Sequence, residues 1–135
     1  MSFSFHVPTN LVFGQGAIQK LHKQRLPGKH ALIVISSGKS TRANGYLDIV
    51  QDQAGVTYTV FDKILANPVL DNVMDGAACA RANGCDFVLG LGGGSSIDAA
   101  KAIAMYIGPS PVRIQVSLTP NLSQISTIVR SLGAP

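Results

Sequence analysis

FVLGLGGGSSIDAAKAIA, residues 87–104, is the stretch that decides the fold, because an apolar run stops at three glycines and two serines before a helical pattern begins. Residues 87–91 have the continuous hydrophobicity of a buried strand. The apolar residues from 97 onward recur at the three-and-four spacing of a helix packed on a sheet. The glycines therefore stand at a strand-to-helix junction.

This junction is suited to binding an anion because it consists of Gly92, Gly93 and Gly94. A chain without Cβ atoms can take a positive φ and lets a ligand approach the main chain closely. The first N–H groups of the following helix, at residues 95–98, have no acceptor within the helix, and the helix dipole adds partial positive charge. Together with Ser95, the turn predicts a site for a pyrophosphate.

An ordinary turn is the alternative interpretation of the same residues. The strict pattern G-x-G-x-x-G places a third glycine where this chain has Ser95, and Ser95 with Asp98 also has the spacing of a helix capping box. Asp98 and Lys101 have the i,i+3 spacing of a surface ion pair, so Lys101 is interpreted as mainly structural. Three consecutive glycines carry an entropic cost that a plain turn does not require, which favours the phosphate site.

GGGSSIDAAKAIA resembles the GGGSxxDxAK signature of the iron-containing alcohol dehydrogenases, a family that includes lactaldehyde reductase and the propanediol and butanol dehydrogenases. Three upstream segments are similar to the family in the same order. They correspond to its opening hairpin and first helix, its first nucleotide-domain strand and its crossover helix, and they read FHVPTNLVFGQGAIQKL, HALIVISSGKS and ILANPVLDNVMDGAACARANGCD. The resemblance runs from about Phe3 to Ala104 and is not recognisable after Met105.

The resemblance implies a cofactor site and a reaction. Gly93, Gly94 and Ser95 fall on positions that hold the cofactor pyrophosphate in the family, and Asp98 falls on the motif aspartate near the nicotinamide. The implied activity is that of an NAD(P)-dependent alcohol dehydrogenase or aldehyde reductase, which passes hydride between the nicotinamide and a small alcohol or aldehyde. Glycerol-type and dehydroquinate-type enzymes share the architecture, but the wording of the motif fits the alcohol dehydrogenases better.

The segment after the strand at 31–36 bears on the choice between NADP and NAD. The family often has an aspartate there that hydrogen-bonds the adenosine ribose, whereas this chain has Ser36 and Ser37. Without that carboxylate, the two hydroxyls with Lys39 and Arg42 become candidates for contact with a 2′-phosphate, which makes NADP a candidate alongside NAD. The alternative is that Ser37 or the serine at 40 caps the next helix and that Lys39 is solvated.

The patterns along the whole chain predict an α/β fold: a Rossmann-like parallel sheet with flanking helices and an N-terminal β-hairpin. The expected elements are a hairpin edge at 2–13, helices at 16–25, 40–53 and 69–82, and strands at 31–36, 57–61 and 86–91. We expect an NAD(P)-binding domain over residues 1–104. A divergent tail over 105–135 is expected to hold one strand, in PVRIQVSLTP with Thr119 in the loop after it, and a short helix in ISTIVRSLGAP.

Family members continue into a helical second domain, where one aspartate and three histidines bind iron or zinc. We expect the chain to lack that domain and its ligands, because His6, His22 and His30 all precede the glycine motif and match none of those positions. No His, Cys or carboxylate cluster has ligand spacing, so neither a metal site nor a catalytic residue is expected here. A non-catalytic nucleotide-binding remnant or module is therefore the alternative function.

Composition indicates how many domains to expect and in which compartment the protein resides. The 135 residues, 46% of them hydrophobic, suit one domain with a real core. We expect a cytoplasmic protein without a membrane partner, because no apolar run approaches the roughly 20 residues of a membrane span and the N-terminus lacks a signal-peptide pattern. Cys79 and Cys85 have no C-x-x-C spacing and provide no disulfide framework.

Charge and exposed apolar surface suggest which partners to expect. The first third is basic, since none of the seven aspartates precedes Asp48, but only Tyr46 lies near those charges, which argues against a nucleic-acid partner. Loss of the second domain would leave apolar surface uncovered, which predicts association, for example as a homodimer.

Overall fold

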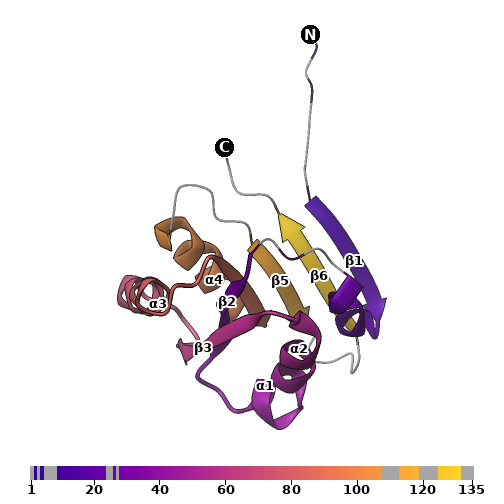
Figure 1. The fold of residues 1–135 in the computed structure, drawn as a ribbon, viewed down its shortest axis with the longest axis horizontal. Coiled ribbons are helices and arrows are strands. Elements are labelled where there is room, and N and C mark those ends of the chain that lie inside the picture. The colour runs from indigo at the N-terminus through magenta and orange to yellow at the C-terminus, as the bar shows by residue number, and fades with distance from the viewer. Residues whose placement is uncertain are drawn as a thin grey trace.

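The computed structural model describes residues 2, 4, 9–23, 26, 28–107, 113–118 and 125–131. Its strands are β1 (Thr9–Gln15), β2 (His30–Ser36), β3 (Thr57–Ile64), β4 (Phe87–Gly92), β5 (Arg113–Leu118) and β6 (Ile125–Ser131). Its helices are the 3-10 helix η1 (Ala17–Lys23), α1 (Ser40–Ala43), α2 (Tyr46–Ala54), α3 (Leu70–Ala82) and α4 (Gly94–Ile107). Within these residues the strands form one six-stranded sheet in the order β1-β6-β5-β4-β2-β3 (Figure 1).

The predicted fold class is confirmed, because β3, β2, β4 and β5 run parallel with helices in the crossovers between them. Most of the first half of the N-terminal hairpin predicted at 2–13 lies outside the described residues, in which the first strand begins at Thr9. Strand β1 pairs antiparallel with β6, so that Thr9 lies opposite Ser131 and Gln15 opposite Ile125. At the end of β1 the chain turns through Gly16, whose φ is 69°, directly into η1. The partner of β1 therefore comes from the other end of the chain.

Residues 113–131 extend the sheet. Strand β5 confirms the strand predicted in PVRIQVSLTP, and it pairs parallel with β4. The prediction of a short helix in ISTIVRSLGAP was wrong, because Ile125–Ser131 form β6 between β1 and β5. Its run of isoleucine, threonine and valine favours a strand when both edges find partners. Thr119 lies outside the described residues.

Two predicted helices differ in form. The helix expected at 16–25 is a 3-10 helix over Ala17–Lys23 in the described part. The helix expected at 40–53 is divided into α1 and α2, and Gly45 with a φ of 75° stands immediately before α2. A residue in that left-handed conformation does not continue an α-helix, so one helix ends before Gly45 and a second begins after it.

The sheet has a hydrophobic core on each face, as expected for a doubly covered parallel sheet. One core joins η1 and α2 to the side chains of β2 and β4 that face them, among them Leu21, Ile33 and Leu89. The other core joins α3 and α4 to the opposite face, with Leu32 and Ile103 fully buried. Figure 1 shows α3 and α4 on the side of the sheet away from α2 and η1.

Neither cysteine forms a disulfide, and both lie at the edge of the second core. Cys79 is half-buried and Cys85 is buried. Burial raises the pKa of the Cys85 thiol, which keeps it protonated and unreactive at neutral pH. Among the helices that the structure describes, none has both the length and the apolar character to cross a bilayer.

The amino-terminal ends of β2 and β4 are joined by Asp86. Its carboxylate accepts hydrogen bonds from the backbone N–H groups of Lys29, at 2.9 and 3.1 Å, and of His30, at 3.0 Å. Gly28 makes room for this carboxylate, since a Cβ there would collide with Oδ1 of Asp86. Burial raises the pKa of Asp86, but these hydrogen bonds and the nearby His30 outweigh it and hold the pKa below its usual value.

We predict that Asp86→Asn lowers the free energy of unfolding at neutral pH by about 0.5–1 kcal/mol, which is less than is usual for a hydrogen bond to a charged group because the carboxylate is exposed. A depressed pKa stabilises the fold above the unfolded-state pKa and loses that effect as the pH falls through the folded-state pKa. Urea unfolding between pH 7 and pH 3 should therefore bring variant and wild type together in acid. Asp52→Asn on α2 is the control, and a constant difference across this pH range contradicts the account.

Candidate functional site

Gly92 is the residue that the strand-to-helix junction requires for its own geometry. Its φ is 135°, a conformation that L side chains rarely adopt. A Cβ at this position would lie 3.0 Å from the Ser96 hydroxyl oxygen, and Ser96 is itself only 1% exposed. Gly92 therefore turns β4 directly into α4.

Gly93 and Gly94 differ from Gly92 in every one of these respects. Both are exposed, and neither has a positive φ. A Cβ placed on either residue would meet no atom within 4 Å. The protein's own packing and backbone geometry therefore do not explain why these two positions are glycine, and open space lies over the first turn of α4.

Ser95 lies within the first turn of α4 rather than at its cap. The Ile97 N–H donates to the Gly93 carbonyl oxygen at 3.1 Å, which makes Gly93 the N-cap. The Ser95 hydroxyl donates instead to the Ala66 carbonyl oxygen in the loop after β3. The capping box considered for Ser95 and Asp98 is thus not formed. Asp98 pairs with Lys101 at 3.7 Å on the exposed face of α4, which confirms that ion pair.

The segment after β2 runs beside the glycine turn. Ser36 is the last residue of β2, and the N–H of Ser37 donates to the Ile64 carbonyl oxygen at 2.8 Å. The Ala43 N–H donates to the Lys39 carbonyl oxygen at 2.9 Å, so Lys39 is the N-cap of α1 and neither Ser37 nor Ser40 holds that position. Ser37 and Lys39 are exposed, and Ser36 is half-buried.

Thr41 connects the segment after β2 with the glycine turn, and it was not predicted from the sequence. It is only 4% exposed, and its hydroxyl oxygen lies 3.9 Å from where a Gly92 Cβ would be. Thr41 and Ser96 are the buried polar residues of the described chain, and both lie next to Gly92. The burial of Ser96 could have been predicted from the sequence, because Ser96 has helical spacing with the apolar residues Ala99 and Ile103. The burial of Thr41 could not, because α1 has a single turn and shows no such spacing.

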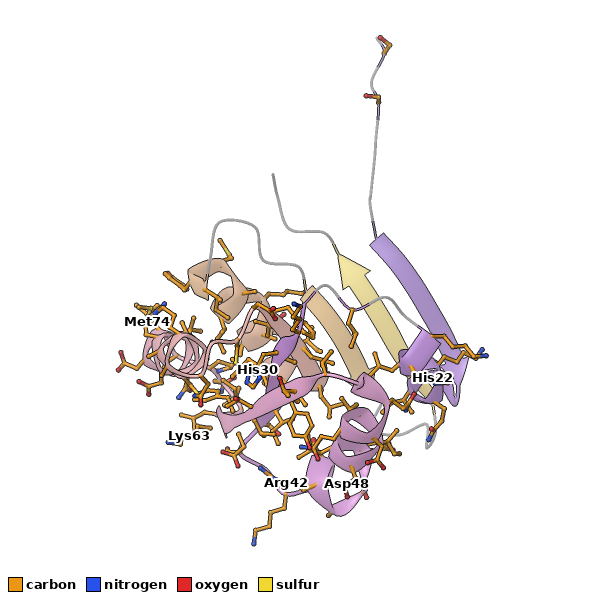
Figure 2. All side chains as sticks on the ribbon, viewed as in Figure 1. His22, His30, Arg42, Asp48, Lys63 and Met74 are labelled. Atoms are coloured by element: carbon orange, nitrogen blue, oxygen red, sulfur yellow. The ribbon has the colours of Figure 1, made fainter. Side chains whose placement is uncertain are left out.

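Arg42, the remaining candidate of this segment, is engaged by an acidic residue. Its guanidinium nitrogen lies 2.8 Å from a carboxylate oxygen of Asp62 on β3. In Figure 2 Arg42 reaches from α1 toward the end of β3, where Lys63 also lies. Because β2, β3 and β4 run parallel, their carboxyl ends lie at the same edge of the sheet, which is where ligands bind in open parallel sheets.

A family model described as iron-containing alcohol dehydrogenase matches residues 8–129 of the chain. The chain belongs to the iron-containing alcohol dehydrogenase family. The match confirms the family resemblance and carries it past Ala104, where it stopped being recognisable in the sequence. Strand β5 lies within this matched region, and β6 overlaps its end.

Three members of the family illustrate the likeness. The chain is 35% identical over 106 residues to a Bacillus subtilis protein named Probable NADH-dependent butanol dehydrogenase 1, covering 76% of this chain and 27% of that one. It is also 35% identical over 104 residues to the Escherichia coli NADPH-dependent aldehyde reductase YqhD, with the same coverage. A solved iron-containing alcohol dehydrogenase from Thermotoga maritima superposes with a TM-score of 0.72 at 31% identity, covering 87% of this chain and 38% of that one.

The chain therefore spans about a quarter of the length of the curated relatives it matches, 27% in both cases.

The family is named for iron, but among the described residues no three His, Cys, Asp or Glu side chains converge as metal ligands. His22 contacts Gln53, and His30 lies 2.6 and 2.8 Å from the hydroxyls of Thr57 and Thr59. Figure 2 shows these two histidines far apart on different elements. His6 lies outside the described residues, and the described side chains do not fit a metal.

We predict that Gly92→Ala lowers the free energy of unfolding by about 1–3 kcal/mol, because alanine at this φ is strained and its Cβ crowds Ser96. Gly94→Ala is the matched control. The backbone at Gly94 is unstrained, and a Cβ there would meet no other atom. The Gly94→Ala variant should therefore keep the wild-type stability or gain up to about 1 kcal/mol, because alanine makes the unfolded chain less flexible. Urea denaturation of both variants measures the contrast. Equal stabilities would show that Gly92 is not the strained residue of the turn.

Proposed function

We propose that this chain binds a nicotinamide dinucleotide at the carboxyl ends of β2, β3 and β4, as the cofactor-binding part of an NAD(P)-dependent alcohol dehydrogenase or aldehyde reductase. One observation carries the proposal. Gly93 and Gly94 are glycines for which the fold itself has no need, and the room that their missing side chains leave lies over the N-terminus of a long helix. A bound pyrophosphate supplies the missing reason.

The charge at this end of α4 suits a pyrophosphate. The N–H groups of Ser95 and Ser96 have no acceptor within the helix, and the helix dipole is positive here. No acidic residue stands in the first turn of α4, and Asp98 follows one turn later with its charge opposed by Lys101. Gly93, Gly94 and these N–H groups would therefore hold the phosphates, with Gly92 fixing the turn and Asp98 lying toward the nicotinamide.

The segment after β2 would hold the adenosine end of the cofactor. Ser36, Ser37 and Lys39 lie in the segment beside the glycine turn. Thr41, in the same segment, packs against Gly92 and holds the segment there. Serine hydroxyls and a lysine in this place can donate hydrogen bonds to the oxygens of a 2′-phosphate, whereas an aspartate would repel it. The relatives do not decide the matter, since one is named NADH-dependent and another NADPH-dependent.

The proposed reaction is hydride transfer between the cofactor and a small alcohol or aldehyde, as the names of the relatives suggest. A bound nicotinamide would donate the hydride to an aldehyde in its reduced form, or accept it from an alcohol in its oxidised form. The residues of this chain bind and orient that cofactor, and none of the described residues is assigned to the substrate. The domain boundary near residue 104, the cytoplasmic location and the homodimer expected from the sequence stay predictions.

A non-catalytic nucleotide-binding module is the second candidate, favoured by the absence of converging metal ligands among the described residues. The two candidates differ in turnover. Oxidation of NADH or NADPH by small aldehydes, catalysed by the 135-residue chain, would support the enzyme. Cofactor binding without turnover would support the module for this chain alone.

We predict that Gly93→Asp abolishes binding of NADH and NADPH, because a carboxylate would fill the space over the first turn and repel the phosphates. The circular dichroism spectrum should stay unchanged, since nothing lies within 4 Å of a Cβ at this position. Fluorescence titration with each cofactor measures the loss. Ala78→Asp, at an exposed position of α3, is the control for the added charge. Unaltered affinity in Gly93→Asp would remove the pyrophosphate assignment.

We predict that Ser36→Asp weakens NADPH binding more than NADH binding, because the new carboxylate repels a 2′-phosphate and can accept a hydrogen bond from a free ribose. A ratio of dissociation constants that shifts about tenfold corresponds to about 1.4 kcal/mol. Titration with both cofactors provides this ratio directly. Equal changes for the two cofactors would mean that Ser36 does not face the 2′-position.

A further inference from the structure

Strand β3 carries a bulge at its carboxyl end. Val34 of β2 lies opposite Phe61, but Ser36 lies opposite Ile64, so three steps along β3 match two along β2. Phe61 and Ile64 are both buried, and the residues between them, Asp62 and Lys63, are both exposed. A regular strand would alternate and bury residue 63. The bulge therefore places two consecutive charged side chains at the surface, as bulges near binding sites often do.

The bulge brings Asp62 to Arg42. The guanidinium and the carboxylate lie 2.8 Å apart, although the two residues are twenty positions apart and come from α1 and β3. Their side chains are 51% and 46% exposed, so the pair is weak and open to competition from a stronger anion. The backbone of Arg42 lies near the glycine turn, because Thr41, the residue before it, packs beside Gly92.

We propose that Asp62 sets the preference between NADH and NADPH by holding Arg42. This inference rests on the proposed function, which places the adenosine end of the cofactor beside Ser36. An arginine there would bind a 2′-phosphate strongly, since its planar fork matches phosphate oxygens. Asp62 occupies that fork and adds a negative charge of its own. It thereby takes over, from the neighbouring strand, the discrimination that an aspartate directly after β2 would provide.

The decisive variants are Asp62→Asn, Arg42→Ala and the double variant, each titrated with NADH and with NADPH. In Asp62→Asn the guanidinium is free, and the dissociation constant for NADPH should fall about five- to tenfold while that for NADH changes less than about twofold. In Arg42→Ala the carboxylate of Asp62 is left alone, and NADPH should bind more weakly than to wild type. A merely structural role would move both cofactors together.

The double variant tests how Asp62 acts. If Asp62 works through Arg42, replacing Arg42 by alanine in the Asp62→Asn background removes the gain in NADPH affinity. If the gain persists, Asp62 acts by its own charge alone and the inference is overturned. Asp75→Asn, which removes an exposed aspartate from α3, is the control for net charge and should leave the ratio of the two dissociation constants unchanged.

The failure of this inference is separable from the failure of the proposed function. Wild-type chain that is folded but binds neither cofactor overturns the proposed function and, with it, the inference. Wild-type chain that binds at least one cofactor, with a NADH-to-NADPH ratio that Asp62→Asn leaves unchanged, overturns the inference alone.

Discussion

The close packing of α4 on β4 is the constraint on which the rest of the structure depends. A Cβ on Gly90 would lie 2.8 Å from the Cβ of Ala100, so the helix can rest on the strand at this distance only because Gly90 has no side chain. Gly92, at a φ of 135°, then lets the chain enter that helix within two residues. Because the two elements are held so closely, the first turn of α4 has to face the carboxyl ends of the parallel strands.

Other contacts at this edge hold the neighbouring loops to the same turn. Ser95 binds the Ala66 carbonyl after β3, Thr41 packs beside Gly92, and the N–H of Ser37 extends the pairing of β2 with β3. Asp86 stabilises the opposite end of the sheet, where its carboxylate satisfies two backbone N–H groups. The contacts that hold the fold and the surface proposed for the cofactor are thus largely separate, and in this account the missing side chains of Gly93 and Gly94 matter only for the second.

Sequence alone predicted the parts whose signal is local. The apolar run, the glycines and the helical spacing lie within residues 87–104, and the ion pair of Asp98 with Lys101 spans a single helical turn. Strand β6 was missed because its pairing depends on β1, more than a hundred residues away, and its short sequence fits either element. The pair of Arg42 with Asp62 depends on a bulge that only the register of β2 and β3 defines.

Mapping the cofactor onto backbone amides tests the central claim most directly, because the account places the phosphates on N–H groups. NADH and NADPH would each be titrated into the ¹⁵N-labelled 135-residue chain. We predict that the largest amide shifts occur at residues 93–97 and 36–39, with the amides of Lys29 and His30 at the other end of the sheet unaffected. A chain whose spectrum is well dispersed but whose residues 93–97 do not respond to either cofactor would contradict the account.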